Sequence, residues 1–419
     1  MENQQSDNVK SDTSQKPTAD DDKPSTYGKK VQEQNTVGLG DQVAKHYNEL
    51  PQASIESRVK SRIFYLRNFH NWIKSVLISE YLTELKKSRR ADSPPISVLD
   101  LCSGKGGDML KWKKGNIGKL VCADIAETSV QQSEERYRDM GRRNEQERYP
   151  QKMFTAEFIT ADCTKQRLKD MYKNNDTTFD LVSCQFSFHY SFESLQQVDM
   201  MLKNACECLK PGGYFIGTTT NSYELVKRWR AAEENSFGNE VYRIEFSCNV
   251  KQDIPLFGSQ YMFHLEGVVD CPEFLGYFPA MVKLAEKYGM KLVSRKPFSE
   301  FFSENITKGD HRSLIGRMQA LEPYPPEEDV DLMSKDTSAY IEADADVNKM
   351  KTQADDPRRR IKVGTLSRAE WETTTLYTTF AFQKVSETVH QQKSHSSRKR
   401  SAAEESNEIS SKIARHEDT

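Results

Sequence analysis

The sequence lacks several features that would settle its class at once. No apolar run approaches the roughly 20 residues that a membrane-spanning helix needs, and the opening Met1-Glu-Asn-Gln-Gln-Ser6 has no apolar segment of the kind found in signal peptides. Only 8 of the 419 residues are cysteine, too few for a disulfide scaffold. None stands in C-x-x-C spacing, and the nearest pair, Cys206 and Cys208, has poor geometry for zinc. We therefore expect no membrane segment, no metal, and reduced cysteines in a cytosolic or nuclear protein.

A charge of one sign is also missing overall, because 60 Lys and Arg residues stand against 62 Asp and Glu residues. The polar residues are unevenly spread: residues 1–42 hold 7 hydrophobic residues and 386–419 hold 6. This pattern predicts disordered tails at 1–42 and 386–419 around one folded domain at 43–385. The second tail contains Ser397-Arg-Lys-Arg400, a basic cluster consistent with nuclear import. We therefore expect the protein in the nucleus.

The segment 54–90 is predicted to form a long helix with one buried stripe. Leu66, Phe69, Ile73 and Val76 recur at steps of three and four residues. The rest of the segment carries nine basic residues against three acidic ones. A charged helix face is often simply solvated, but this imbalance is also typical of contact with nucleic acid or phosphate.

Beyond this helix, short apolar runs alternate with helical patterns. Strands are predicted at 97–102, 120–125, 157–161, 179–185, 214–219, 291–294 and 376–382, with helices at 128–140 and 193–210 among the segments that separate them. Strands that alternate with helices indicate an α/β fold, here with a doubly wound, mostly parallel sheet of seven strands.

Two stretches interrupt this alternation. Residues 235–270 are predicted to be a β-rich insertion, with strands at 242–246 and 261–265. Residues 322–357 contain 11 acidic and 3 basic residues, so we expect an acidic lobe that extends to about residue 360. Its composition suggests loose packing or mobility.

The most informative segment is Val98-Leu-Asp-Leu-Cys-Ser-Gly-Lys-Gly-Gly-Asp108, which predicts a strand, a glycine-rich turn and the start of a helix. It is neither a dinucleotide fingerprint, since a methionine stands where the third glycine belongs, nor a P-loop. Asp100, Asp124 and Asp162 end successive strands, and Asp124 has the spacing of a carboxylate that binds ribose hydroxyls. Such acids can merely cap helices. As a trio they favour a nucleoside ligand without phosphate, which they would repel.

Together these features resemble class I S-adenosylmethionine-dependent methyltransferases, and more closely the mRNA cap guanine-N7 methyltransferases. The resemblance covers 43–384 and is carried by Ser61-Arg-Ile-Phe-Tyr-Leu-Arg-Asn-Phe69, Lys105-Gly-Gly-Asp-Met-Leu-Lys-Trp112, Cys184-Gln-Phe-Ser-Phe-His-Tyr190, Phe215-Ile-Gly-Thr-Thr219, Leu265-Glu-Gly-Val268 and Met318-Gln-Ala-Leu-Glu-Pro-Tyr324. It implies a Rossmann-like fold and transfer of a methyl group from S-adenosylmethionine to N7 of the GpppN cap of mRNA, with no metal.

The resemblance also implies which residues bind each substrate. Contacts to the cofactor fall on Lys74, Cys102, Asp124, Asp162, Gln185 and Tyr190. Contacts to capped RNA fall on His70, Asn71, Lys105, Lys111, Arg136, Phe186, His189, Glu266 and Tyr377. Aromatic rings can hold guanine by its face, a carboxylate at Glu266 can accept from its N1 and N2 hydrogens, and basic side chains can neutralise the triphosphate. Because N7 has a free lone pair, His189, Glu266 and Tyr190 would position the base rather than transfer a proton.

Three departures from the family pattern leave alternatives open. Cys102 and Ser103 replace the first glycine of the turn and its neighbour, His70 stands where asparagine is common, and Thr220 stands where proline is expected. The chain could instead be an RNA-binding scaffold with a decayed methyltransferase site, or a methyltransferase for another RNA base or a small molecule. The resemblance further implies a small activating subunit at the acidic lobe, and joint action with the capping machinery and the RNA polymerase II transcription complex.

Overall fold

The computed structural model describes residues 39–49, 55–248, 251–356 and 360–385, all within one compact unit. The predicted tails therefore lie outside the described residues, except that a helix, α1 (Leu39–Glu49), covers the last residues of the first one. The basic cluster at 397–400 also lies outside them. Among the described helices, none is both long and apolar enough to cross a bilayer.

A seven-stranded sheet forms the centre of the fold, as predicted. Its strands are β1 (Ser97–Leu101), β2 (Lys119–Asp124), β3 (Thr155–Thr160), β4 (Phe179–Gln185), β5 (Leu209–Thr220), β10 (Met290–Pro297) and β13 (Tyr377–Lys384). Their order is β10-β13-β5-β4-β1-β2-β3, and β13 alone runs against its neighbours. All five residues of β1 are buried, as expected for a parallel strand covered on both faces.

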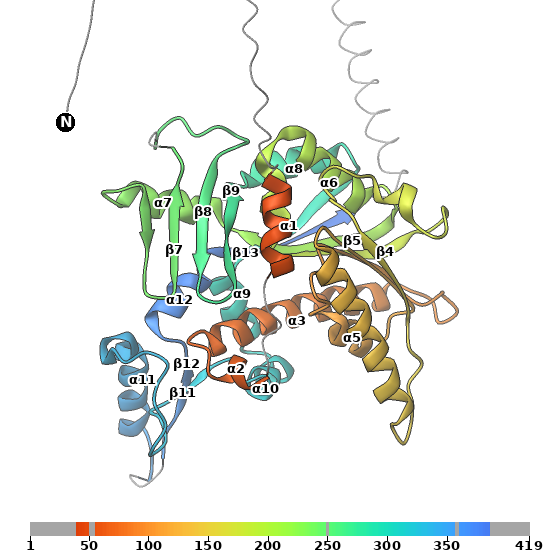
Figure 1. Ribbon diagram of the computed structural model, residues 1–419. Helices are drawn as coiled ribbons and strands as arrows, with labels where there is room; N and C mark the ends of the chain where they lie inside the picture. Colours follow the sequence, from red (N-terminus) through yellow and green to blue (C-terminus); the bar gives the residue numbers. More distant parts are fainter. Residues whose placement is uncertain (1–38, 50–54, 249–250, 357–359, 386–419) are drawn as a thin grey trace, which may run out of the picture. The chain divides into compact units, whose positions relative to one another are not determined.

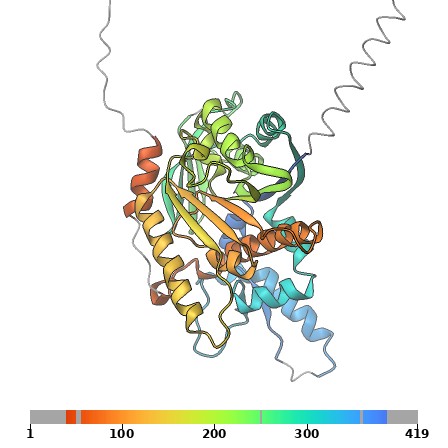
Figure 2. The same cartoon turned by 90° about the vertical axis from the view of Figure 1, so that its right-hand side faces the viewer.

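Helices cover both faces of this sheet (Figure 1). Val98 of β1 belongs to a hydrophobic cluster that contains residues of α3 (Phe64–Lys87), α4 (Met109–Lys114), α9 (Phe298–Asn305) and α10 (Gly309–Arg317). The next residue, Leu99, points the other way and belongs to a second cluster, which contains residues of α6 (Leu195–Cys206) and α8 (Phe278–Glu286). The long helix α5 (Glu127–Glu145) follows β2, and Figure 2 shows it from the side. The carboxyl ends of the parallel strands are where a ligand site is expected in such a fold. Three short helices complete this part of the chain: η1 (Leu168–Met171), η2 (Phe188–Glu193) and α7 (Ser222–Ala231).

The predicted β-rich insertion is a separate antiparallel sheet of β6 (Ser236–Gly238), β7 (Tyr242–Phe246), β8 (Gln260–Leu265) and β9 (Val269–Phe274). Strands β7 and β8 were predicted, whereas β6 and β9 were not. β9 contains Asp270 and Pro272, two residue types that are rare in strands, so its sequence did not predict a strand. Proline is tolerated here because β9 is at the edge of its sheet.

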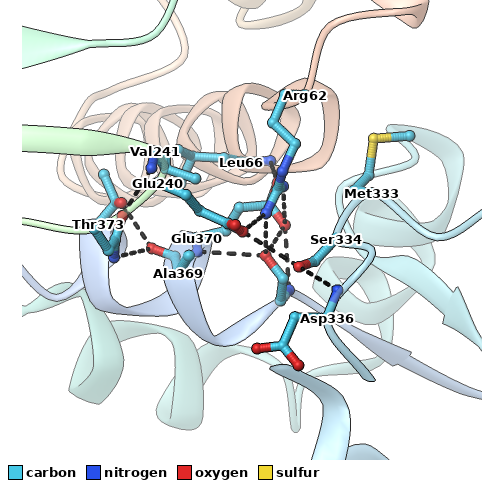
Figure 3. A network of polar contacts seen from close by, with 12 residues as sticks. Arg62, Leu66, Glu240, Val241, Met333, Ser334, Asp336, Ala369, Glu370 and Thr373 are labelled. Atoms are coloured by element: carbon cyan, nitrogen blue, oxygen red, sulfur yellow. Dashed lines mark hydrogen bonds and ion pairs between the residues drawn. The ribbon is translucent and has the colours of Figure 1, made fainter. Parts of the chain in front are cut away.

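The prediction of one helix over 54–90 is wrong at its start, because α2 (Ile55–Val59) ends before α3 begins. Arg62 lies in the break, where its guanidinium contacts Glu240 at 2.5 Å and the fully buried Glu370 at 3.7 Å (Figure 3). Glu370 also accepts from the Ser367 hydroxyl at 2.7 Å, in the capping box that begins α12 (Arg368–Thr374). Burial raises the pKa of Glu370, while Ser367 and Arg62 oppose the change. The break places Arg62 where it can balance this buried acid.

The acidic lobe forms helices and short strands where it is described. It contains β11 (Glu322–Tyr324), η3 (Thr337–Tyr340) and α11 (Ile341–Thr352), and is followed by β12 (Val363–Thr365), which pairs with β11. The Tyr340 hydroxyl donates to Glu322 at 2.7 Å, so a buried carboxylate organises the lobe. Ser334 donates to Glu240 at 3.2 Å, which joins the lobe to the Arg62 network in Figure 3.

Candidate active site

The turn after β1 is built by residues in the left-handed region of backbone conformation. Cys102, Gly104 and Gly106 have φ of 53°, 51° and 69°. Glycine adopts such values freely, but a residue with a Cβ does so at a cost of roughly 1–2 kcal/mol. Cys102 therefore holds a conformation that favours the glycine of the family pattern.

Asp124, at the end of β2, faces this turn. One carboxylate oxygen accepts from the Gly104 N–H at 2.8 Å and the other from the Ala126 N–H at 2.9 Å. Burial raises the pKa of Asp124, while these two N–H groups oppose the shift. The carboxylate is thus fixed in orientation, and each oxygen keeps a lone pair for a ligand.

A cavity of about 490 Å³ lies over the carboxyl ends of β1, β2, β3 and β4, a volume suited to a small molecule. All six residues predicted for the cofactor line it, namely Lys74, Cys102, Asp124, Asp162, Gln185 and Tyr190. Asp162 is held in place by Thr164, whose N–H and hydroxyl donate to it at 2.9 and 2.6 Å. We call this space the cofactor cavity. All three strand-end acids singled out in the sequence, Asp100, Asp124 and Asp162, line it.

Two acids and two lysines form a network beside the cofactor cavity, which Asp100, Asp108 and Lys74 line. Asp108 pairs with Lys74 at 2.9 Å and Lys111 at 2.7 Å, and these cations outweigh burial and lower its pKa to about 2. Asp100 accepts from the Trp112 indole at 3.1 Å. Burial, and then the charge of Asp108, raise the pKa of Asp100 to about 7. One carboxylate of this pair is therefore firmly ionised and the other is poised to titrate.

A second cavity, of about 470 Å³, adjoins the first and shares Tyr47, Lys74, Phe186 and Tyr190 with it. Here His70 stacks on Phe186 with 5.2 Å between ring centroids, and Tyr377 meets Phe186 edge-on at 5.0 Å. Burial lowers the pKa of His70 to about 3, so this ring is uncharged at physiological pH. The predicted residues that line this aromatic cavity are His70, Asn71, Phe186, His189 and Tyr377.

The acid in the aromatic cavity is Glu273, not Glu266. Glu273, on β9, is 3% exposed; it accepts from the Tyr261 hydroxyl at 2.8 Å and lies 3.2 Å from Nε2 of His189. Glu266 is exposed in the turn between β8 and β9 and lines neither cavity. Tyr261 pairs with Glu273, and Leu265 with Val269, so the turn is roughly 14 Å away at about 3.4 Å per residue. Of the two acids, Glu273 lines the aromatic cavity and Glu266 does not.

Basic side chains gather where the two cavities meet. Arg58 and Arg67 line both cavities, while Lys105 and Arg136 line the first. Burial and then repulsion from neighbouring cations, Arg58 among them, lower the pKa of Arg67, Lys105 and Arg136. Lys111 is turned away into a neighbouring groove, where it donates to Asn71 and pairs with Asp108. A group of mutually repelling cations beside a cavity indicates a site for an anion.

The sequence analysis did not single out Arg58, Arg67, Tyr47 or Glu273 as site residues. Glu273 did leave a signal, since it is the acid in the otherwise apolar run Cys271-Pro-Glu-Phe-Leu275. Arg58 and Arg67 were counted with the basic helix but not assigned to a site. Nothing in the sequence pattern marked Tyr47 as a site residue. Among the described residues, no group of three or more His, Cys, Asp or Glu side chains is placed to hold a metal.

Comparison with known proteins gives one consistent result. Residues 30–385 match the mRNA (guanine-N(7))-methyltransferase domain. The mRNA cap guanine-N(7) methyltransferase of Drosophila melanogaster is 47% identical over 348 residues, which are 83% of this chain and 77% of that protein. The enzyme of the same name from Caenorhabditis elegans is 42% identical over 348 residues, 82% of this chain and 86% of that protein. With most of both chains aligned at this identity, the protein belongs to the mRNA (guanine-N(7))-methyltransferase family.

Proposed function

We propose that this protein transfers the methyl group of S-adenosylmethionine to N7 of the guanosine in the GpppN cap of mRNA. The observation that carries the proposal is the junction of two cavities at Lys74, Phe186 and Tyr190. One cavity contains the strand-end acids and the other is lined by aromatic rings. A methyl donor and a purine acceptor placed on either side of this junction are neighbours. S-adenosylmethionine would supply a methyl group made electrophilic by its sulfonium, and the residues around it need only hold both substrates in line.

The cofactor cavity offers a partner for each polar part of that nucleoside. Asp124, already oriented by two N–H groups, would accept from the ribose hydroxyls. Asp162, oriented by Thr164, would accept from the adenine amino group. Lys74 would pair with the carboxylate of the methionine part. The residues present therefore fit the cofactor, and the Cys102 side chain narrows the cavity without removing any of these groups.

The aromatic cavity offers the matching partners for guanine. The stacked His70 and Phe186 and the edge of Tyr377 would enclose the base by its faces. We assign to Glu273 the role predicted for Glu266, because a buried carboxylate can accept from both N1–H and the N2 amino group, which adenine lacks. His189, held beside Glu273, would position the base. The uncharged His70 adds no positive charge next to the incoming methyl group.

The triphosphate would lie against the cations at the junction, Arg58, Arg67, Lys105 and Arg136. Neutralising phosphates in this way supplies affinity that does not depend on base sequence and weakens with salt. Lys111 would not contact the triphosphate but would hold Asp108 and Asn71 in place, through an ion pair with the first and a hydrogen bond to the second. Since N7 already has a lone pair, catalysis would depend on alignment and electrostatics rather than on a general base.

The test is incubation of the full chain with labelled S-adenosylmethionine and GpppN-capped RNA, followed by nuclease digestion and identification of the methylated nucleoside. We expect label on guanine N7 of the cap, and none with Asp124→Ala. Label on another base, or none on capped RNA, would reject the proposal. The strained Cys102 favours one rival, the scaffold with a decayed site, and calorimetry with S-adenosylhomocysteine separates the two because a scaffold would not bind it.

We extend the proposal to organisation and partners. The catalytic unit would span 43–385 between the two tails, and the protein would act in the nucleus with the capping machinery and the RNA polymerase II transcription complex. A small activating subunit would dock on the acidic lobe, 322–360. Support for docking comes from its exposed apolar side chains Val330, Ile341 and Met350, and from the network that ties the lobe to Arg62. Binding of a basic partner lost in the full chain carrying Ile341→Asp and Met350→Asp would support this site.

A further inference from the structure

The groove into which Lys111 turns has a volume of about 440 Å³ and takes no part in the proposed function. It is lined by one face of α3, by α4 with the residues next to it, and by the end of α10, and α3 contacts both of these helices. We call it the lysine groove. From Asn68 to Lys86 the face of α3 is about 27 Å long, at 1.5 Å per residue. The lining residues of α3 recur at helical spacing: Asn68, Asn71, Ser75, Ile78, Ser79, Leu82, Thr83 and Lys86. The groove therefore has the length for a chain rather than for one small molecule.

One end of the lysine groove meets the site described above. Asn68 and Asn71 line both the groove and the aromatic cavity, and Gly107 lines both the groove and the cofactor cavity. Gly107 is exposed and lies two residues after Lys105, one of the cations assigned to the triphosphate. A Cβ at Gly107 would meet no atom within 4 Å, so the passage is open at this point. A chain that leaves the triphosphate can therefore enter the groove without a change in the fold.

The lining of the lysine groove is cationic. It contains Lys86, Lys111 and Lys114, and no Asp or Glu of the described residues. Lys111 is engaged with Asp108. Lys86 and Lys114 are exposed, and neither has an ion pair in the part of the chain that the structure describes. Unpaired cations along a groove that begins at a triphosphate site indicate a polyanion as its occupant.

Hydroxyl groups and apolar side chains complete the lining. The Ser75 hydroxyl donates to the Asn71 carbonyl at 2.8 Å. The Thr83 hydroxyl donates to the Ser79 carbonyl at 2.7 Å. Because their hydrogens are used within α3, both oxygens can only accept, and the 2′-hydroxyl of ribose is a donor. Leu110 is 55% exposed, but among the described residues no aromatic ring lines the groove on which a base could stack. The lining therefore suits a sugar–phosphate backbone and offers little to distinguish one base from another.

We propose that the lysine groove binds the nucleotides that follow the cap, by their backbone and without regard to sequence. This role deepens the proposed function and rests on it for the cap that brings the RNA to the end of the groove. At roughly 3.4 Å or more between successive nucleotides, the face of α3 holds at most about eight of them. Lys86 and Lys114 pair with phosphates, so the added affinity falls with salt. Binding that ignores sequence suits an enzyme whose transcripts differ from one another.

The experiment measures, by calorimetry, the affinity of the full chain saturated with S-adenosylhomocysteine for GpppG and for a series of longer capped RNAs. In the unmodified protein we expect the affinity to rise about tenfold with RNA length at low salt and to level off near about eight nucleotides. Capped oligo(U) and oligo(A) of equal length should bind within about threefold of each other.

The test variant is Lys86→Gln combined with Lys114→Gln. It should lose most of the gain with RNA length and keep its affinity for GpppG within about twofold. The dependence of log Kd on log salt should become less steep by about 1.4, since each contact to a single strand contributes roughly 0.7. The matched control is Lys87→Gln combined with Lys283→Gln, which removes the same charge from residues that line none of the three spaces. It should keep the full gain.

The affinity for S-adenosylhomocysteine and the midpoint of thermal unfolding show that each variant is folded. Equal affinity for GpppG and for long capped RNA would overturn the proposal and leave the groove to a protein partner. A gain that persists without Lys86 and Lys114, or that the control loses equally, would also overturn it. If the protein methylates cap N7 but RNA length has no effect, the role of the groove alone is refuted. If the gain depends on Lys86 and Lys114 but no methyl group reaches N7, the proposed function alone is refuted.

Discussion

The assignment of Glu273 rather than Glu266 to guanine recognition makes the sharpest prediction. The change is Glu273→Gln, which conserves shape and keeps an oxygen to accept from Tyr261 at 2.8 Å. Glutamine cannot accept from both N1–H and the N2 amino group of guanine. One hydrogen bond to a charged acceptor contributes about 1.5–3 kcal/mol. In the variant, the glutamine amide N–H would also face an N–H of guanine, so that two donors oppose each other. We therefore expect a loss of about 2–4 kcal/mol, which is roughly 30- to 700-fold in kcat/KM for capped RNA.

The assay compares guanosine-capped RNA with inosine-capped RNA, which lacks the N2 amino group. The unmodified protein should prefer guanosine, and Glu273→Gln should lose most of this preference while its affinity for S-adenosylhomocysteine stays the same. Glu266→Gln is the matched control, because Glu266 is exposed and roughly 14 Å away along the hairpin. Its kcat/KM should stay within about twofold. If Glu266→Gln loses the guanosine preference and Glu273→Gln keeps it, the assignment is refuted.

Three further predictions concern strain, charge and pH. Because Cys102 has a φ of 53°, the unfolding free energy of Cys102→Gly, measured by denaturant titration, should exceed that of Cys102→Ala by about 1 kcal/mol. A more stable alanine variant would contradict the strain. Arg62→Met should cost about 3–5 kcal/mol of unfolding free energy because Glu370 stays buried without its cation, and Glu370→Gln added to it should restore much of that loss. Asp100, with a pKa raised to about 7, must lose its proton to favour a cationic ligand, so S-adenosylmethionine should bind more tightly as pH rises from roughly 6 to 8. Below pH 7 the change should approach about tenfold per unit and vanish in Asp100→Asn, and calorimetry showing tighter binding at lower pH would reverse the sign of this argument.

The main sheet could be predicted because its signal is local. The central strands β1 and β4 are buried along their whole length and therefore read as short apolar runs, and the helices between the strands have their own period. The break between α2 and α3 has no such signal, because helix-forming residues continue through Arg62. The first turn of α3 is capped by a buried acid about 300 positions later, because Glu370 accepts from the N–H of Leu66 at 3.3 Å, and only the fold defines the position of Glu370.

That Asp124 and Asp162 would face one cavity could be predicted for a related reason. Asp124 is the last residue of β2 and Asp162 comes two residues after β3, and parallel strands bring their carboxyl ends to one edge. The aromatic cavity has no equivalent rule, since it combines α3, η2, β9 and β13 from distant parts of the chain. The charge pattern over residues 54–90 indicated a site for an anion, but it did not predict that Arg58 and Arg67 line both cavities.

The choice between Glu266 and Glu273 shows where motif spacing stops being informative. Both acids lie within one hairpin, and the Leu-Glu-Gly-Val segment marks its turn, which is where Gly267 takes a φ of 64°. A turn is recognised in sequence by such residues, whereas the depth of a side chain in a cavity depends on how the strands pair. Tyr261 pairs with Glu273, and both are buried beside His189. The acid that can discriminate between bases is therefore the one that its strand register removes from water. A buried carboxylate that meets a base without the matching N–H stays unpaired, which costs binding free energy, whereas an exposed carboxylate binds water instead.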